Sequence, residues 1–191
     1  MPVLPIYNCF HPIMKMKTEP IKEITDEISQ LISDMFDTLY GTSNGVGLAA
    51  NQVGKSLSLF IIDVSSVDEY KEMKPFVCIN PQITDFSDET NYYNEGCLSA
   101  PNFFEEVERP TSITLTYFDK EMNENVLNAD GFLARVLQHE YDHLDGVLFY
   151  DKLSAFKRTL NRSKLRKLRE NEVDIDYDMI DTEGNLQKSN D

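Results

Sequence analysis

The chain has 191 residues and a formal net charge of −15, with 41% hydrophobic and 27% charged residues. This length and composition are typical of one soluble globular domain with a sizeable core. No apolar run is long enough to span a bilayer, and the start of the chain lacks the basic and apolar regions of a signal peptide. The three cysteines are unevenly spaced, which disfavours a disulfide framework and indicates a reducing compartment. We therefore expect a cytoplasmic protein.

The first regular element is predicted to be an amphipathic helix that begins after Thr25. Thr25 suits the N-cap, and Asp26 and Glu27 fall in the first turn, where carboxylates favour the helix dipole. Residues 41–44 should end the helix. Its apolar stripe at helical spacing is formed by Ile28, Leu31, Ile32, Met35, Phe36 and Leu39.

Residues 45–52, with the sequence Gly-Val-Gly-Leu-Ala-Ala-Asn-Gln, follow this helix and precede a strand. The two glycines allow unusual backbone angles and close approach to a ligand. The segment lacks the Gly-Lys-Ser/Thr ending of a phosphate loop, and the dinucleotide pattern is absent too. Gln52 offers an amide donor for a developing oxyanion. The alternative is an ordinary tight turn that packs through its small residues.

Strands are predicted over 57–64 and 76–83, which are apolar and bounded by turn residues, and over 111–118, which alternates. Residues 119–124 are typical of a hairpin loop that leads into a further strand over 125–129. No repeat and no linker suggests a second domain.

The most informative feature is a His-Glu-Tyr-Asp-His sequence at 139–143, within a predicted helix over 130–144. Positions i and i+4 share one helix face, so His139 and His143 point the same way, as two ligands of one metal ion require. Glu140 would lie beside the water that such a metal activates, as a candidate general base. The alternative is a pair of structural histidines with an unrelated glutamate.

Two histidines do not complete a catalytic metal site, which normally has three protein ligands and leaves one position to water. No His or Glu follows at the spacing of the common metalloproteases, so the third ligand should be a carboxylate, a cysteine or His11. The best candidate is Cys97, beside Gly96 in the sequence Glu-Gly-Cys-Leu-Ser, although a lone cysteine is more often a small buried apolar residue. A thiolate ligand suits iron or zinc better than magnesium.

Together, residues 45–52, 95–99 and 138–143 resemble the three signature motifs of the peptide deformylases, in the order of that family. The resemblance covers about residues 4–168. It implies a compact α+β single domain, with antiparallel and mixed strands around a central metal-binding helix and with a C-terminal helix. It also implies a catalytic domain over 1–169 that removes the N-terminal formyl group from formyl-methionine of nascent polypeptides and releases formate.

The same resemblance implies roles for single residues. Glu140 would act as the base, and the Gln52 amide and the backbone N–H of Leu98 would stabilise the oxyanion. One divalent metal is expected, with Fe²⁺ as the usual ion and Zn²⁺, Ni²⁺ or Co²⁺ as alternatives. Its three ligands would be Cys97, His139 and His143.

The methionine side chain of the substrate needs an unbranched apolar pocket. Phe132 and Val136 lie on the metal-binding face of the predicted helix, so they are pocket candidates together with Val46 and Gly47. Phe104 occupies the position where the family usually has an arginine, which is expected to make the outer pocket more apolar. For the larger side chains, plain core packing is the alternative.

Three further residues are expected to support the site. Glu95 and Arg109 resemble the family's buried acid–base pair, which would hold the metal-bearing strand; the alternative is a surface ion pair of little energetic worth. Asp142 is a candidate acceptor for an N–H of a ligand histidine, or else a solvated helix residue.

Charge is unevenly distributed near the C-terminus. Residues 152–169 contain eight basic residues and no acid, whereas 170–191 contain eight acids and one lysine. One helix is predicted over 154–170, followed by an acidic, flexible tail over 170–191. The basic helix at 152–169 is a candidate dock for the ribosome, with a solvated helix face as the alternative. We expect no membrane partner and no specific nucleic acid.

Two other classes of function remain at this point. An ordinary zinc endopeptidase is disfavoured by the missing downstream ligand and by the first two motifs. A noncatalytic metal-stabilised binding module is disfavoured because it would need neither Glu140 nor Gln52.

Overall fold

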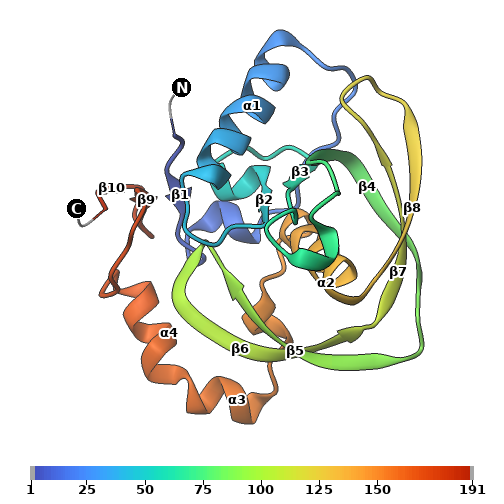
Figure 1. Ribbon diagram of the computed structural model, residues 1–191. Helices are drawn as coiled ribbons and strands as arrows, with labels where there is room; N and C mark the ends of the chain where they lie inside the picture. The colour runs from blue at the N-terminus through green and yellow to red at the C-terminus, as the bar shows by residue number, and fades with distance from the viewer. Residues whose placement is uncertain (1–2, 190–191) are drawn as a thin grey trace.

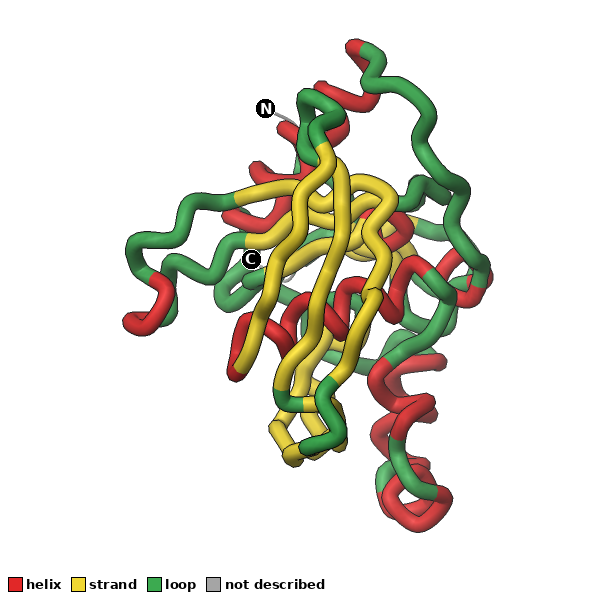
Figure 2. Tube along the Cα trace, turned by 90° about the vertical axis from the view of Figure 1, so that its right-hand side faces the viewer, coloured by secondary structure: helices red, strands yellow, loops and turns green. Residues whose placement is uncertain are grey.

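The structure, a computed structural model, describes residues 3–189. At its centre helix α2 (Gly131–Leu144) packs against a five-stranded antiparallel sheet (Figure 1). Figure 2 shows the long strands side by side, with helical segments behind them. The strand order is β2 (Gly47–Ala49), β3 (Leu59–Ile62), β4 (Phe76–Phe86), β7 (Ser112–Phe118) and β8 (Glu124–Asp130).

Helix α2 is buried along most of its length, and glycine begins it. Gly131 has a φ of 54°, a backbone conformation that residues with a Cβ rarely adopt. Leu133, Ala134 and Leu137 then pack into the core between helix and sheet. The predicted helix is thus confirmed, and it carries both histidines.

Helix α1 (Asp26–Tyr40) covers the sheet through β2 and β3. The Thr25 hydroxyl accepts a hydrogen bond from Ile28 N at 3.3 Å, which confirms the predicted N-cap. The helix buries one stripe of apolar side chains, Leu31, Ile32, Met35 and Leu39. It therefore packs against β2, which lies within residues 45–52.

A second sheet is a long hairpin of β5 (Thr90–Cys97) and β6 (Ala100–Pro110). Sequence patterning did not predict it, because five of the eight β5 residues are solvent-exposed and the strand shows no apolar alternation. The register shifts between Gly96 and Cys97, so the chain turns tightly just after the cysteine. This turn holds Cys97 near α2.

The C-terminal segment forms a third sheet with the start of the chain. β9 (Met179–Ile180) pairs in parallel with β1 (Ile6–Tyr7) and antiparallel with β10 (Leu186–Gln187). Ile175 and Met179 are buried, while between them Asp176 is exposed and Asp178 is half-buried. The prediction of a flexible tail is wrong for this stretch, because apolar residues alternate with acids and pack on the body. The last two residues of the predicted tail lie outside the described residues.

The predicted C-terminal helix is present, but it is divided into α3 (Ala155–Leu160) and α4 (Arg162–Arg169). Asn161 lies between them with helix-breaking angles, φ −91° and ψ 7°. Its buried amide donates to Glu105 Oε1 at 2.7 Å, so a contact with β6 outweighs local helix propensity. In Figure 1 both helices lie at the lower edge of the molecule, beyond the β5–β6 hairpin.

Short 3₁₀ helices complete the fold: η1 (Pro12–Lys15), η2 (Ala50–Val53), η3 (Asp68–Tyr70) and η4 (Phe149–Lys152). Within residues 3–189, no helix has the length and apolar character needed to cross a membrane. The predicted α+β domain with strands around a central helix is confirmed.

Candidate active site

Two elements bring three potential metal ligands together. Cys97 ends β5, and His139 and His143 lie one helical turn apart on α2. Their donor atoms all lie within 4.8 Å of one another, and Cys97 Sγ is 3.3 Å from His143 Nε2. Of the open third-ligand candidates the cysteine is thus the one at the site. His11 lies elsewhere, where its side chain caps η1.

Each histidine offers one ring nitrogen to the three-residue donor set. His139 Nδ1 lies 3.0 Å from Glu95 Oε2 and donates its N–H to that carboxylate. This hydrogen bond leaves Nε2 of His139 available for a metal. His143 Nδ1 is buried and has no hydrogen-bond partner among residues 3–189, while its Nε2 faces the thiol. The imidazoles meet edge to face, with ring centroids 4.9 Å apart.

The surroundings shift the pKa values of the two imidazoles in opposite directions. Burial lowers the pKa of His143 and favours its neutral form, which is the form that ligates metals. Burial acts in the same direction on His139, but its contacts with Cys97 and Glu95 outweigh burial and raise its pKa. A soft thiolate with two imidazoles suits a transition metal.

Glu140 faces the same centre from the next position on α2. Its side chain is buried, and Oε2 has no hydrogen-bond partner within the described chain. Burial raises the pKa of this carboxyl to about 7. A Cβ on Gly47 would lie only 2.7 Å from Glu140 Oε1, so glycine at position 47 leaves room for the carboxylate. These features fit a group that exchanges a proton with a bound water.

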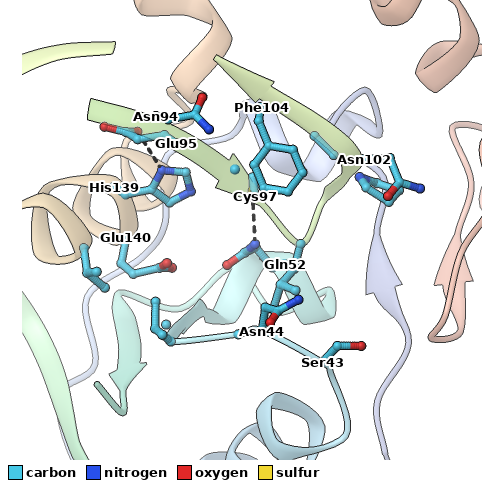
Figure 3. A pocket seen from close by; sticks show the side chains of 18 of the residues that line it. Ser43, Asn44, Gln52, Asn94, Glu95, Cys97, Asn102, Phe104, His139 and Glu140 are labelled. Atoms are coloured by element: carbon cyan, nitrogen blue, oxygen red, sulfur yellow. Dashed lines mark hydrogen bonds and ion pairs between the residues drawn. The ribbon is translucent and has the colours of Figure 1, made fainter. Parts of the chain in front are cut away.

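Gln52, on η2, is oriented by hydrogen bonds from both ends of its amide. Oε1 accepts from Ala49 N at 2.8 Å, and Nε2 donates to Ser99 Oγ at 3.2 Å. Nε2 also lies 3.6 Å from Cys97 Sγ, as the dashed line in Figure 3 marks. The amide donor therefore points toward the ligand set.

A cavity of about 650 Å³ opens over this centre (Figure 3). Its lining includes ten of the eleven predicted site residues: Val46, Gly47, Gln52, Cys97, Leu98, Phe104, Phe132, Val136, His139 and Glu140. The eleventh, His143, is buried behind the thiol. The three motif segments, residues 45–52, 95–99 and 138–143, thus meet at one cavity.

The model of the polypeptide deformylase family matches residues 3–159. The chain belongs to this family. A peptide deformylase of Salinibacter ruber is 43% identical over 185 residues, which cover 93% of this chain and 94% of the relative. The crystal structure of the Ehrlichia chaffeensis peptide deformylase in complex with actinonin matches this structure with a TM-score of 0.78. The two sequences are 38% identical, and the match covers 87% of this chain and 98% of that one. The enzyme from Legionella pneumophila has a TM-score of 0.80 at 34% identity, over 90% and 98% of the two chains.

Membership of the peptide deformylase family identifies the activity. The chain is a metal-dependent hydrolase that removes the N-terminal formyl group of nascent peptides. The Cys97, His139 and His143 donor set fits the single divalent metal of such an enzyme.

In this deformylase Phe104 lines the outer part of the cavity and is 58% exposed. Its ring lies against the backbone of Gly96, where a Cβ would be 2.4 Å from the ring. Phe132, which also lines the cavity, is half-buried, with its ring centroid 5.8 Å from that of Tyr93. The cavity therefore has apolar surface both at its mouth and inside.

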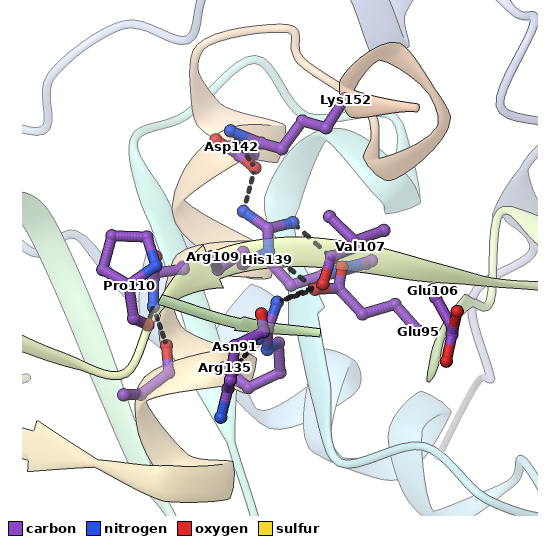
Figure 4. A network of polar contacts seen from close by, with 12 residues as sticks. Asn91, Glu95, Glu106, Val107, Arg109, Pro110, Arg135, His139, Asp142 and Lys152 are labelled. Atoms are coloured by element: carbon purple, nitrogen blue, oxygen red, sulfur yellow. Dashed lines mark hydrogen bonds and ion pairs between the residues drawn. The ribbon is translucent and has the colours of Figure 1, made fainter. Parts of the chain in front are cut away.

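A buried ion network supports the ligands (Figure 4). The Glu95 carboxylate accepts from Arg109 Nε at 2.6 Å, from Arg109 Nη2 at 2.9 Å and from Arg135 Nη1 at 2.9 Å, and it also contacts His139. The predicted buried Glu95–Arg109 pair is confirmed. The expectation that Asp142 orients a ligand histidine is wrong, because Asp142 pairs with Arg109 and Lys152 while Glu95 holds His139.

Sequence reasoning missed three residues of this site. Arg135 precedes His139 by four positions on one helix face, so helical spacing was a usable signal. Ser99, which holds the Gln52 amide, lies within the 95–99 motif, but no role was predicted for it. Tyr177, which donates to the Leu98 carbonyl at 2.6 Å, lies in no motif and had no local sequence pattern to indicate it.

Proposed function

We propose that this deformylase hydrolyses the formamide bond of formyl-methionyl peptides with Glu140 as the group that moves the proton. The observation that carries the proposal is the buried Glu140 Oε2, which has no hydrogen-bond partner among residues 3–189 and lies beside the Cys97, His139 and His143 donor set. A divalent metal on those ligands would supply a water of near-neutral pKa and polarise the formyl oxygen.

In the proposed reaction Glu140 first accepts a proton from the attacking water. The water oxygen adds to the formyl carbon, and negative charge develops on the former carbonyl oxygen. Gln52 Nε2 and the Leu98 N–H donate hydrogen bonds to that oxygen. Glu140 then delivers its proton to the leaving nitrogen, the C–N bond breaks, and formate and a free α-amine are released.

The substrate's methionine side chain is proposed to enter the apolar part of the cavity. Val46, Phe132 and Val136 are its proposed contacts, and all three border the cavity and the main core cluster. Gly47 allows the substrate backbone to approach closely. Phe104 at the mouth is proposed to contact the residues that follow the methionine, where an arginine would offer a charge instead.

We propose Fe²⁺ as the native ion, because a thiolate with two imidazoles suits it. Protein purified without oxygen and loaded with Fe²⁺ or Zn²⁺ should release formate from formyl-Met-Ala-Ser and leave its internal peptide bonds intact. The iron form should be faster, and it should decay in air because the thiolate and the iron are both oxidisable.

Two results would contradict these proposals separately. Cleavage of an internal peptide bond without formate release would contradict the reaction. A zinc enzyme as fast and as durable as the iron enzyme would contradict only the choice of ion.

We further propose a cytoplasmic enzyme that meets its nascent substrates at the ribosome through α3 and α4. These helices present exposed cations on an otherwise acidic protein, and RNA phosphates would repel the remaining surface. Charge reversal at three exposed positions, Arg158→Glu, Arg166→Glu and Lys167→Glu, should abolish cosedimentation with ribosomes at low salt. Binding by the parent should itself weaken steeply with added salt.

The same triple variant provides the control for this prediction. Its turnover of short formyl-peptides should equal that of the parent, since the changed residues lie outside the cavity lining. Equal cosedimentation of variant and parent would identify the basic helices as a solvated face.

A further inference from the structure

The segment that follows α4 forms one wall of the active-site cavity. Residues 174–177 line it together with residues of the three motif segments. Asp176 Oδ2 accepts a hydrogen bond from Ser43 Oγ at 2.5 Å, and the Asp174 carbonyl accepts from Asn102 Nδ2 at 3.0 Å. Figure 3 shows Ser43 and Asn102 at the side of the cavity away from Glu140. The wall is thus tied to both the α1–β2 loop and β6.

One residue of this wall reaches the catalytic backbone itself. The Tyr177 hydroxyl donates to the carbonyl of Leu98 at 2.6 Å. The residue is half-buried, and burial raises the pKa of its hydroxyl, which keeps it a donor. Its position is fixed from the next strand, where Met179 is buried and pairs with Ile6 of β1.

The contact matters because residues 97–99 form a tight turn with several functions. Cys97 is a potential metal ligand, and Ser99 holds the Gln52 amide. The Ser99 carbonyl is itself held by Cys9 N at 2.8 Å. Between these two anchored residues, the Leu98 carbonyl has Tyr177 as its side-chain partner.

We propose that Tyr177 is a positioning residue for the oxyanion site. With Cys97 fixed on one side and the Leu98 carbonyl fixed on the other, the backbone torsions of Leu98 are restricted and its N–H keeps one direction. The inference rests on the role proposed above for that N–H. It also extends the functional unit beyond residue 169, where the sequence predicted the catalytic domain to end.

The direct test is Tyr177→Phe, which removes the hydroxyl and keeps the ring. We expect kcat for formyl-Met-Ala-Ser to fall about tenfold, less than the hundredfold or more that follows deletion of an oxyanion donor itself. KM and the inhibition constant of the product Met-Ala-Ser should stay unchanged, because the ground-state contacts remain. The matched control is Tyr40→Phe, which deletes a 2.9 Å hydrogen bond to Asp63 outside the cavity.

A second readout does not depend on turnover. In the zinc-loaded protein without substrate, hydrogen exchange of the Leu98 amide should be faster in Tyr177→Phe than in Tyr40→Phe or the parent. The amide of Val107, buried in β6, serves as internal reference.

Each outcome decides the matter. An unchanged kcat and unchanged Leu98 exchange overturn the proposal. The proposal is also overturned if Tyr177→Phe loses metal, melts at a lower temperature and has a lower kcat, and if Val107 exchange is faster as well. Tyr177 would then only stabilise the fold. If the parent releases no formate, the proposed reaction fails, and the Leu98 exchange rate alone decides whether Tyr177 positions that amide.

Discussion

Replacing Glu140 with alanine should reduce formate release by at least about a hundredfold while the protein keeps its metal. The carboxylate is not among the three clustered donors, so the ligand set stays complete. By contrast, Cys97→Ala, His139→Ala or His143→Ala should lose the metal itself. Elemental analysis of each purified protein, together with its kcat/KM, distinguishes the two classes.

Glu140→Gln is the matched variant for this prediction. It preserves the volume packed against Gly47 but removes the carboxylate that is proposed to exchange the proton. Its loss of activity should therefore equal that of Glu140→Ala within a few-fold. Near-normal deformylation by either variant would show that another group moves the proton.

The site residues that the sequence predicted are those whose chemistry shows in short-range spacing along the chain. Helical spacing alone put His139 and His143 on one face, and the incomplete ligand count directed attention to a cysteine. Gly47 and Gln52 were suspected for general reasons of backbone freedom and amide chemistry. The family resemblance then joined three segments that no local pattern could bring together.

The missed features depend on contacts between distant parts of the chain. Tyr177 bonds to a residue 79 positions away, and Asn161 divides the last helix through a contact 56 positions away. Propensity and periodicity describe neither contact. Strand β5 was not predicted for another reason: its side chains are mostly exposed, so apolar and polar residues do not alternate along it.

Asp142 illustrates how a chemically reasonable role can be assigned to the wrong carboxylate. Asp142 directly precedes His143 in the sequence, whereas Glu95 lies on another element. A helix residue adjacent in sequence points about 100° away, so it cannot easily face the neighbouring imidazole. Glu95 approaches His139 from the hairpin, and this explains why the acid–base pair and the metal ligands form one network.

Breaking that network should have the largest effect on stability. Arg109 is 3% exposed, and it makes two hydrogen bonds to Glu95 and one to Asp142. Arg109→Met would leave a buried carboxylate with fewer partners, and removal of one partner from a buried ion pair typically costs about 3–5 kcal/mol. Urea unfolding with the metal in excess should show this loss. Arg109→Lys should recover only part of it, since an ammonium cannot reproduce the two-pronged contact.

The exposed pair of Arg166 and Glu170 on α4 provides the comparison. Its N–O distance, 2.8 Å, lies within the range of 2.5–3.0 Å found in the buried network, but both side chains are solvated. Arg166→Met should therefore cost no more than about 0.5 kcal/mol. If Arg109→Met were equally mild, Arg135 and His139 would suffice to stabilise the Glu95 charge. A large difference in the loss of unfolding free energy would instead show that burial, rather than distance, makes the network stabilising. Weaker metal binding by Arg109→Met would further show that the network orients His139.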